Sequence, residues 1–178
     1  IITNDPWIGT GHIPDVNVLR PVFRNGSIIG FVMTITHLVD VGGRGSSTLN
    51  KEVYEEGLLI PPIKIYKRGE VNEDLLDIIN NNVRAPEQVM GDIMANISGT
   101  YVGGLKLNEL LDQYELDDLQ GVADGIIRQS DSAIREKIQA MPDGVYSNQL
   151  KVETQDEEAL LLKCSLEIKA DTITVDFA

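Results

Sequence analysis

Two β-prone runs joined by Asn25-Gly26 constrain the fold of this chain more than any other feature of its sequence. The first run covers residues 16–23 and the second covers residues 28–38. Asn-Gly adopts at low cost the left-handed backbone conformations that a two-residue hairpin turn requires. We therefore predict an antiparallel hairpin, and its register decides which residues meet at the far end of the two strands.

The only two histidines lie at that far end. Two glycines precede His12 and Pro14 follows it, which excludes a regular helix and predicts a shaped loop. Asp15 immediately precedes the first strand, and His37 nearly ends the second. Antiparallel pairing then brings Asp15 beside His37, and His12 lies only three residues from Asp15. Two imidazoles and a carboxylate are thus expected to converge at one point.

This set of side chains is typical of a site for a divalent transition metal that keeps positions open for water or substrate. A metal held there could generate hydroxide or polarise a carbonyl group. The simpler alternative is a surface hydrogen bond between a loop histidine and a nearby acid. Spacing alone leaves both interpretations open.

The middle of the chain has a helical pattern. Asn72 is a candidate N-cap for a helix that ends at Asn82, and Pro86 suits the first position of a second helix. We expect Asn108 to begin a short third helix. A fourth is predicted over residues 117–141, with an apolar stripe that we interpret as a core or subunit-packing face.

The last part returns to strands. Residues 160–168 alternate apolar and polar side chains, which predicts a half-buried strand paired with residues 172–177. Cys164 lies on the apolar side and is interpreted as a small core residue. Strands, then helices, then strands indicate an α+β fold. We divide it into a β-rich region (1–70), a helical region (71–141) and an antiparallel β region (142–178).

Composition narrows the possible partners and compartments. A net charge of −13 argues against nucleic acid as a partner, because both surfaces would be negative. No apolar run is long enough to cross a bilayer, and a single cysteine excludes an internal disulfide, as in a cytoplasmic protein. The chain lacks an initiator Met and both ends fall inside apparent strands, so we expect a piece of a longer protein.

Five segments resemble, in order, the motifs of the hydantoinase B/oxoprolinase family: residues 4–16, 36–43, 55–62, 82–92 and 171–177. The first contains Asn4-Asp5-Pro6-Trp7 and ends with His12-Ile13-Pro14-Asp15-Val16. The resemblance therefore spans nearly the whole chain. One departure is that many relatives carry His-His-x-Asp where this chain has His37-Leu38-Val39-Asp40.

The resemblance implies a B-type subunit whose metal ligands correspond to His12, Asp15 and His37, with zinc or manganese as the usual metal. A further carboxylate ligand is expected from chain preceding Ile1. It also implies a hetero-oligomer with an A-type subunit that binds ATP and phosphorylates the substrate. The substrate would be a cyclic amide in the N-methylhydantoinase and oxoprolinase branches, or a ketone in the acetone and acetophenone carboxylases.

Two further residues are candidates for a catalytic role. Asp40 is placed to orient His37, or else to cap the turn before Gly42-Gly43. Arg84 is placed to hold an anionic phosphorylated substrate, or else to form an ion pair with Asp92 or Glu87. Glu56 is a weaker candidate to face the site. The glycine-rich segment 42–48 lacks the Gly-Lys-Ser/Thr ending of a phosphate-binding loop, so we expect no ATP site there.

We expect this chain to be the metal-bearing part of an ATP-dependent cyclic-amide hydrolase, inactive by itself. The first alternative is a subunit of a ketone carboxylase. The second, from another class, is a scaffold that binds the A-type subunit without chemistry of its own.

Overall fold

The computed structural model describes residues 1–9, 11–45, 47–153 and 159–177. The chain forms two compact units, Ile1–Leu119 and Gln120–Ala178, which are described separately. Both combine antiparallel strands with helix, so the predicted α+β class is confirmed. The finer division into regions 1–70, 71–141 and 142–178 stays a prediction.

The hairpin is the centre of the first unit. Strand β2 (Asp15–Arg24) pairs antiparallel with β3 (Ser27–His37), and Asp15 lies opposite His37 as predicted. Asn25 and Gly26 form the turn with φ angles of 50° and 79°, the left-handed conformation that this dipeptide favours. Strand β1 (Ile2–Thr3) adds to the other edge of β2.

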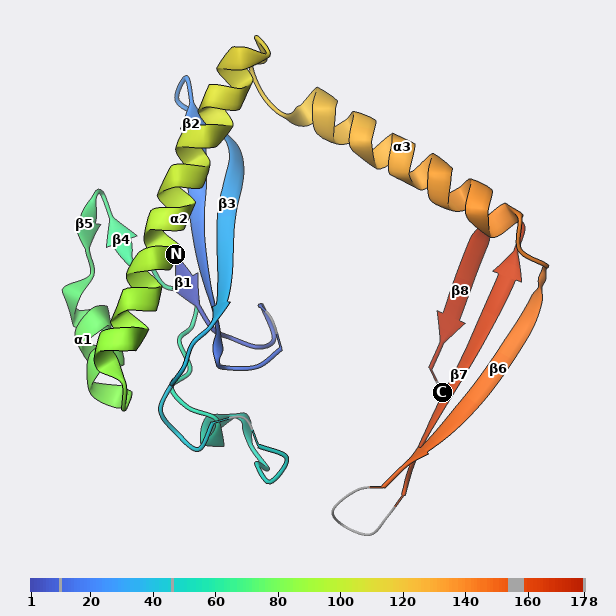
Figure 1. Ribbon diagram of the computed structural model, residues 1–178, viewed down its shortest axis with the longest axis horizontal. Coiled ribbons are helices and arrows are strands. Elements are labelled where there is room, and N and C mark those ends of the chain that lie inside the picture. The colour runs from blue at the N-terminus through green and yellow to red at the C-terminus, as the bar shows by residue number, and fades with distance from the viewer. Residues whose placement is uncertain (10, 46, 154–158, 178) are drawn as a thin grey trace. The chain divides into compact units, whose positions relative to one another are not determined.

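Helix α2 (Pro86–Gln113) packs on one face of the hairpin and runs along its length (Figure 1). Gly103 allows the close approach, because a Cβ atom there would lie 2.8 Å from Val32 Cγ1. Pro86 begins the helix as predicted, but Asn108 lies inside it. The expected separate helix at Asn108 is therefore wrong, because packing against β2 and β3 carries α2 through that residue.

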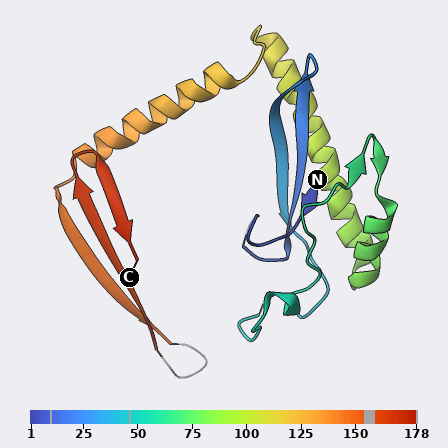
Figure 2. The same ribbon diagram turned by 180° about the vertical axis from the view of Figure 1, so that it is seen from behind.

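Helix α1 (Glu73–Asn82) packs beside the first turns of α2 (Figure 2). The Asn72 side chain accepts a hydrogen bond from Leu75 N at 3.2 Å, which confirms the predicted N-cap. A 3-10 turn η1 (Val53–Glu55) and the short strands β4 (Tyr66–Lys67) and β5 (Glu70–Val71) complete the unit. One apolar cluster joins these pieces, with Ile2, Ile13, Val16, Ile79, Val89 and Ile93 fully or almost fully buried.

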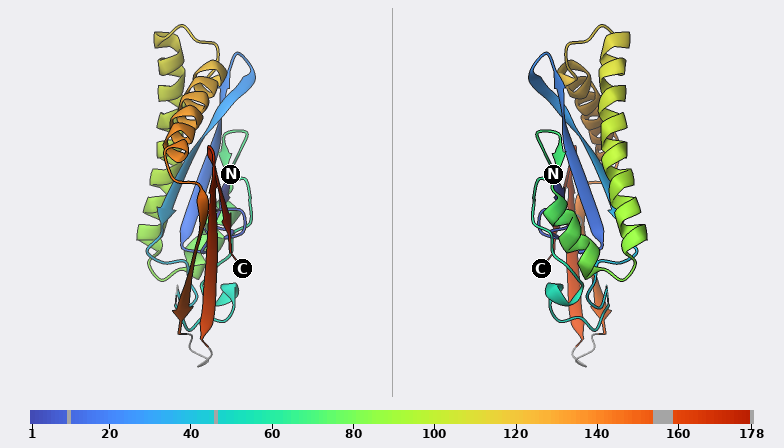
Figure 3. Two further views of the ribbon diagram at one scale, coloured as in Figure 1. Left: turned by 90° about the vertical axis from the view of Figure 1, so that its right-hand side faces the viewer. Right: turned by 90° about the vertical axis from the view of Figure 1, so that its left-hand side faces the viewer.

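The second unit consists of helix α3 (Gln120–Gln139) and a sheet of three strands, β6 (Gly144–Val152), β7 (Leu160–Lys169) and β8 (Thr172–Asp176). The strands lie in sequence order, with the predicted pairing of β7 and β8 (Figure 3). Strand β6 lies in the predicted antiparallel β region (142–178), although the sequence analysis did not single it out as a strand. The apolar stripe of α3 has no buried residue among those described, and Ile126, Ile127 and Ile134 are exposed.

The apolar side of β7 is buried only at its second half. Ile168 is buried, whereas Leu160 and Leu162 are exposed. Cys164 is only half-buried, so its interpretation as a core residue agrees with the structure only in part. No helix in the described part of the chain is both long and apolar enough to span a bilayer.

Candidate metal centre

The start of β2 and the end of β3 place two of the candidate ligands side by side. His37 Nδ1 lies 2.9 Å from Asp15 Oδ1, a hydrogen-bonding distance. The contact follows directly from the register, since the two residues are partners in the antiparallel pair. The side chains also lie on the face of the hairpin opposite α2, because neighbouring Val16 and Thr36 belong to the other face.

The preceding loop brings His12 to the same carboxylate. His12 Nε2 lies 3.0 Å from Asp15 Oδ2, and the centroids of the two imidazole rings are 5.1 Å apart. One ligand atom from each residue can be chosen so that all lie within 4.8 Å of one another. The sequence prediction that His12, Asp15 and His37 come together therefore agrees with the geometry, while their role as metal ligands stays a prediction.

The carboxylate between the two imidazoles is favoured in its charged form. Burial of the Asp15 carboxyl raises its pKa, but hydrogen bonds from His12 and His37 outweigh burial and leave the pKa below its ordinary value. The side chain of Asp15 is 22% exposed and that of His37 is 61% exposed. An anionic oxygen donor with two imidazole nitrogens beside it therefore opens toward solvent.

These donors fit zinc or manganese by their chemistry. Nitrogen and oxygen ligands bind Zn²⁺ at about 2.0–2.2 Å, so tetrahedral ligand atoms lie roughly 3.4 Å apart. The observed separations, up to 4.8 Å, would need only a small closing movement of the side chains. Three protein ligands also leave coordination positions for water or substrate, as catalytic sites require.

Asn4 fixes the loop that carries His12, and sequence reasoning did not single it out. Its side chain is 1% exposed. The Nδ2 group donates to Ile13 O and Leu58 O, both at 2.9 Å, and Oδ1 accepts from Ile60 N at 2.6 Å. A buried amide can donate and accept at once, so Asn4 joins the His12 loop to residues 58–60. Its only signal in the sequence was its place at the head of the first motif.

Glu56 holds the same loop from the other side. Its Oε2 accepts a hydrogen bond from the backbone N–H of Ile13 at 3.1 Å. Glu56 therefore contacts the residue next to His12, while the expectation that it faces the site stays a prediction. Ile13 itself is fully buried, so the loop is anchored by an apolar side chain and by both of its backbone polar groups.

Asp40 and Arg84 contact each other. Arg84 Nη1 donates to Asp40 Oδ1 at 2.9 Å, and the backbone N–H of Arg84 donates to Asp40 Oδ2. Gly42 N donates to Asp40 Oδ1 at 3.0 Å, and Arg84 Nη2 donates to Gly43 O. Arg84 therefore forms its ion pair with Asp40, and the expected partners Asp92 and Glu87 are wrong. The turn-capping alternative for Asp40 agrees with these contacts, while a catalytic role for either residue stays a prediction.

The glycines of this turn are explained by close packing. Gly43 has a φ of 55°, and a Cβ there would lie 2.6 Å from Gly57 N. Gly42, with a φ of 78°, would place a Cβ 2.4 Å from Asn82 O. Any side chain would thus separate the segment after β3 from the end of α1 and from the turn that carries Glu56.

The chain matches a family model and several known proteins over nearly its whole length. The family model for hydantoinase B/oxoprolinase matches residues 1–178. The B-type subunit of a putative D-/L-hydantoinase from Pseudomonas sp. (strain NS671) is 32% identical over 99% of this chain and 31% of its own length. The beta subunit of caprolactamase from Pseudomonas jessenii is 32% identical over 96% of this chain and 30% of its own length.

Solved structures have the same fold. The ATP-dependent caprolactamase of Pseudomonas jessenii superposes with a TM-score of 0.90 at 31% identity, covering 99% of this chain and 31% of that chain. A nucleotide-free acetone carboxylase superposes with a TM-score of 0.81 at 23% identity, covering 99% of this chain and 26% of that chain, which shows a shared fold.

The chain thus spans about a third of the length of the hydantoinase and caprolactamase relatives, both of which are named as subunits. The motif that supplies His12 and Asp15, the strand that supplies His37, and the motifs around Glu56 and Arg84 all lie within the matched region. With its family model matched from end to end, this chain belongs to the hydantoinase B/oxoprolinase family.

Proposed function

We propose that this chain is the metal-bearing part of the B-type subunit of an ATP-dependent cyclic-amide hydrolase, acting in the cytoplasm. The observation that carries the proposal is the convergence of His12, Asp15 and His37 on one solvent-facing point. Relatives named as a caprolactamase subunit and as a putative hydantoinase subunit support the choice of a cyclic amide as substrate.

The three side chains would divide the work of holding the metal. Asp15 would supply a charged oxygen, and His12 and His37 would supply neutral imidazole nitrogens. When bound, zinc or manganese supplies a Lewis acid that lowers the pKa of water and polarises a carbonyl group. Asn4 and Glu56 would keep His12 in place through the backbone of Ile13.

We assign the use of ATP to an A-type partner subunit. That subunit would phosphorylate the amide oxygen, which makes the amide carbon a better electrophile and the C–N bond easier to break. The share of this chain would be to position the activated amide and water for ring opening. A hetero-oligomer of the A-type and B-type subunits is therefore part of the proposal. The hydantoinase and caprolactamase relatives of this chain are likewise named as subunits.

A ketone carboxylase is the second candidate. The observation in its favour is the acetophenone carboxylase delta subunit of Aromatoleum aromaticum, which is 25% identical over 98% of this chain. Substrate tests with the intact complex separate the candidates. Ring opening of a lactam or hydantoin that needs ATP but no bicarbonate supports the hydrolase, whereas ATP-dependent uptake of bicarbonate into a ketone supports the carboxylase.

The test of the proposed role uses the intact complex with Asp15→Asn, and Asp92→Asn as the matched control. Asp92 is an exposed residue of α2 outside the cluster. We expect Asp15→Asn to lower ATP-dependent ring opening by at least about 100-fold, since it removes the charged ligand, with subunit assembly unchanged. Equal activity of the two variants would overturn the proposal in favour of a scaffold.

A further inference from the structure

Two buried polar side chains of α2 contact the hairpin, and one of them lies close behind the candidate metal centre. Asn96 is 4% exposed and Thr100 is 1% exposed. Burying a polar group without a partner is costly, so each of these side chains needs a hydrogen-bonding partner inside the protein. The position of that partner tells which part of the hairpin each residue holds.

Asn96 bonds to the residue that precedes His37. Its Nδ2 group donates to Thr36 Oγ1 at 2.6 Å, and its backbone carbonyl accepts from Thr34 Oγ1 at 3.4 Å. Side chains alternate between the two faces of a strand, so Thr36 faces α2 while His37 faces the candidate metal centre. Asn96 therefore holds the end of β3 from the opposite side of the hairpin, one residue before His37.

The end of β3 needs support from outside its ladder. Among the described strands, β3 lies at the edge of its sheet, so only β2 pairs with it. His37 is the last residue of the strand, and just beyond it Leu38 N donates to Pro14 O at 2.8 Å. Ladder bonds lie in the plane of the sheet. A bond to α2 restrains the strand end perpendicular to that plane, where the ladder constrains it least.

The chain beyond His37 is tied to the same helix. Asp40 Oδ1 accepts from Arg84 Nη1 at 2.9 Å, and Asp40 Oδ2 accepts from the backbone N–H of Arg84. Arg84 lies two residues before Pro86, where α2 begins. His37 therefore lies between two attachments of its chain to the N-terminal half of α2 and the residues just before it, one at Thr36 and one at Asp40.

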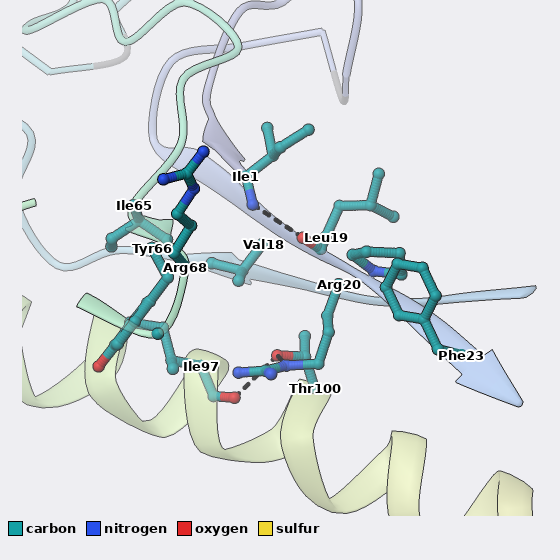
Figure 4. Close-up of a pocket in the computed structure, with 12 residues that line it drawn as sticks. Ile1, Val18, Leu19, Arg20, Phe23, Ile65, Tyr66, Arg68, Ile97 and Thr100 are labelled. Carbon is teal, nitrogen blue, oxygen red and sulfur yellow. Dashed lines mark hydrogen bonds between the residues drawn. The ribbon is translucent and has the colours of Figure 1, made fainter. Parts of the chain in front are cut away.

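The other buried polar residue of α2 acts elsewhere on the hairpin. Figure 4 shows Thr100 in the wall of a hollow beside β2, where its hydroxyl accepts from Arg20 Nε at 3.4 Å and donates to Ile97 O at 2.8 Å. Arg20 lies five residues beyond Asp15, roughly 17 Å along the strand. Thr100 thus holds the middle of the hairpin, whereas Asn96 holds the end that carries His37.

We infer that Asn96 is a positioning residue of the candidate metal centre, acting on His37 through the hydroxyl of Thr36. The inference rests on the proposed function, because it concerns the same cluster. Asn96 and the candidate ligands lie on opposite faces of the hairpin, so its effect is on the backbone that places His37 Nδ1 2.9 Å from Asp15 Oδ1. Without the bond from Asn96, the end of β3 would shift, and His37 would shift with it.

The test uses matched variants of the intact protein at two neighbouring threonines. Thr36→Val replaces the hydroxyl with a methyl group and leaves Asn96 Nδ2 without its acceptor, whereas Thr36→Ser keeps the acceptor. Thr34→Val is the control, since Thr34 also bonds to Asn96 but lies two residues further from His37. The serine variant separates the loss of the hydrogen bond from any change at residue 36.

Binding of Co²⁺ is the first readout, because its visible absorption spectrum reports the geometry of its ligands. We expect Thr36→Val to bind Co²⁺ at least about tenfold more weakly than the wild type, with an altered spectrum, as loss of a group that orients a metal ligand does. Thr36→Ser and Thr34→Val should keep the affinity and the spectrum of the wild type.

Hydrogen exchange in the metal-free protein is the second readout. A peptide that contains Leu38 reports the N–H that donates to Pro14 O, so its exchange rate measures opening of the strand end. We expect at least about fivefold faster exchange in Thr36→Val and unchanged exchange in Thr36→Ser and Thr34→Val. If Thr36→Val fails to fold, Thr36→Val/Asn96→Leu takes its place, because it replaces both partners with apolar groups.

Exchange in Thr36→Val no faster than in Thr34→Val would overturn the inference. So would equal impairment of Thr36→Ser and Thr36→Val, or Co²⁺ binding of equal affinity by Thr36→Val and the wild type. A wild type that binds no Co²⁺ would contradict the proposed function instead. The exchange rates would then still decide whether Asn96 and Thr36 hold the strand end that carries His37.

Discussion

The two units of the chain differ in how much of their apolar surface they bury. In Ile1–Leu119, helix α2 covers one face of the hairpin and a continuous cluster of buried side chains extends to the loop that carries His12. In Gln120–Ala178, Ile168 is the only buried apolar side chain among the described residues, and Ile127 of α3 is 65% exposed. A core fixes the candidate site, whereas the described residues of the second unit leave its apolar faces uncovered within that unit.

The difference explains why a site can be derived from the first unit alone. The pairing of β2 with β3 places Asp15 and His37. The loop that carries His12 is held by the buried side chain of Ile13 and by hydrogen bonds of the Ile13 backbone with Asn4 and Glu56. In the described part of the second unit, α3 has no buried side chain, and Arg135 of α3 forms an ion pair with Asp171 at 3.2 Å. The prediction that its stripe is a core or subunit-packing face stays open, since Ile126, Ile127 and Ile134 are exposed within this unit.

The largest expected contrast is between core truncations in the two units. Ile93→Ala, at a fully buried position of α2, should lower the free energy of unfolding by about 2–5 kcal/mol, because it leaves a cavity. Ile127→Ala, at an exposed position of α3, should change it by less than about 0.5 kcal/mol. Urea unfolding of the intact protein measures both free energies. Equal losses would mean that Ile127 is covered in the intact protein to an extent similar to Ile93.

A second contrast concerns buried and exposed amides. Asn4→Ala should cost about 3 kcal/mol, because it leaves Ile13 O, Leu58 O and Ile60 N without their partner inside the protein. Asn148→Ala in β6 is the control, since Asn148 is exposed, and it should cost less than about 0.5 kcal/mol. The unfolding midpoint in urea distinguishes them. An unaltered midpoint for Asn4→Ala would contradict its role as the anchor of the His12 loop.

The smallest contrast is in the response to acid. Burial of the Asp40 carboxyl raises its pKa, but hydrogen bonds from Arg84 and Gly42 outweigh burial and lower the pKa below its ordinary value. The unfolded state therefore takes up the proton first as pH falls. The contribution of Asp40 to stability is present above its ordinary pKa, about 3.9, and is lost as pH falls through the lowered one.

Asp40→Asn should therefore lose less stability than the wild type when pH is lowered from about 5 to about 2, the window in which this carboxyl titrates. Asp131→Asn, which removes an exposed ion pair with Arg135 in α3, should follow the wild type. Thermal unfolding at a series of pH values checks the pair. Parallel curves for the wild type and Asp40→Asn would show that the contacts of Asp40 with Arg84 and Gly42 do not contribute.

Local chemistry accounts for the parts of the fold that the sequence could predict. Asn25-Gly26 set the hairpin turn, and antiparallel pairing brought Asp15 near His37. An irregularity between Val22 and Phe23, which no local rule predicted, shifts the register by one residue and places the two directly opposite each other. Asn72 and Pro86 marked two helix starts because capping and the missing proline N–H act within a single turn. The end of α2 could not be read in this way, because Gly103 packs against Val32 and tertiary contact overrides helix propensity.

The residues that hold the candidate site in place could not be predicted from the sequence, for a similar reason. The bonds of Asn4 to Leu58 and Ile60, of Glu56 to Ile13, and of Arg84 to Asp40 join residues more than forty positions apart. No spacing rule links such residues in a single sequence. The candidate ligands were predictable because one hairpin brings them together, whereas their anchors depend on how three separate segments fold against it.

The most direct test of the account is the metal content of the intact protein, measured by inductively coupled plasma mass spectrometry after exhaustive dialysis. The variant is His12→Ala/His37→Ala, and the control is Asp92→Asn. The account predicts near-stoichiometric zinc or manganese in the wild type and the control, and its loss in the double variant with folding unchanged. Equal trace metal in all three proteins would contradict it and leave the scaffold interpretation in its place.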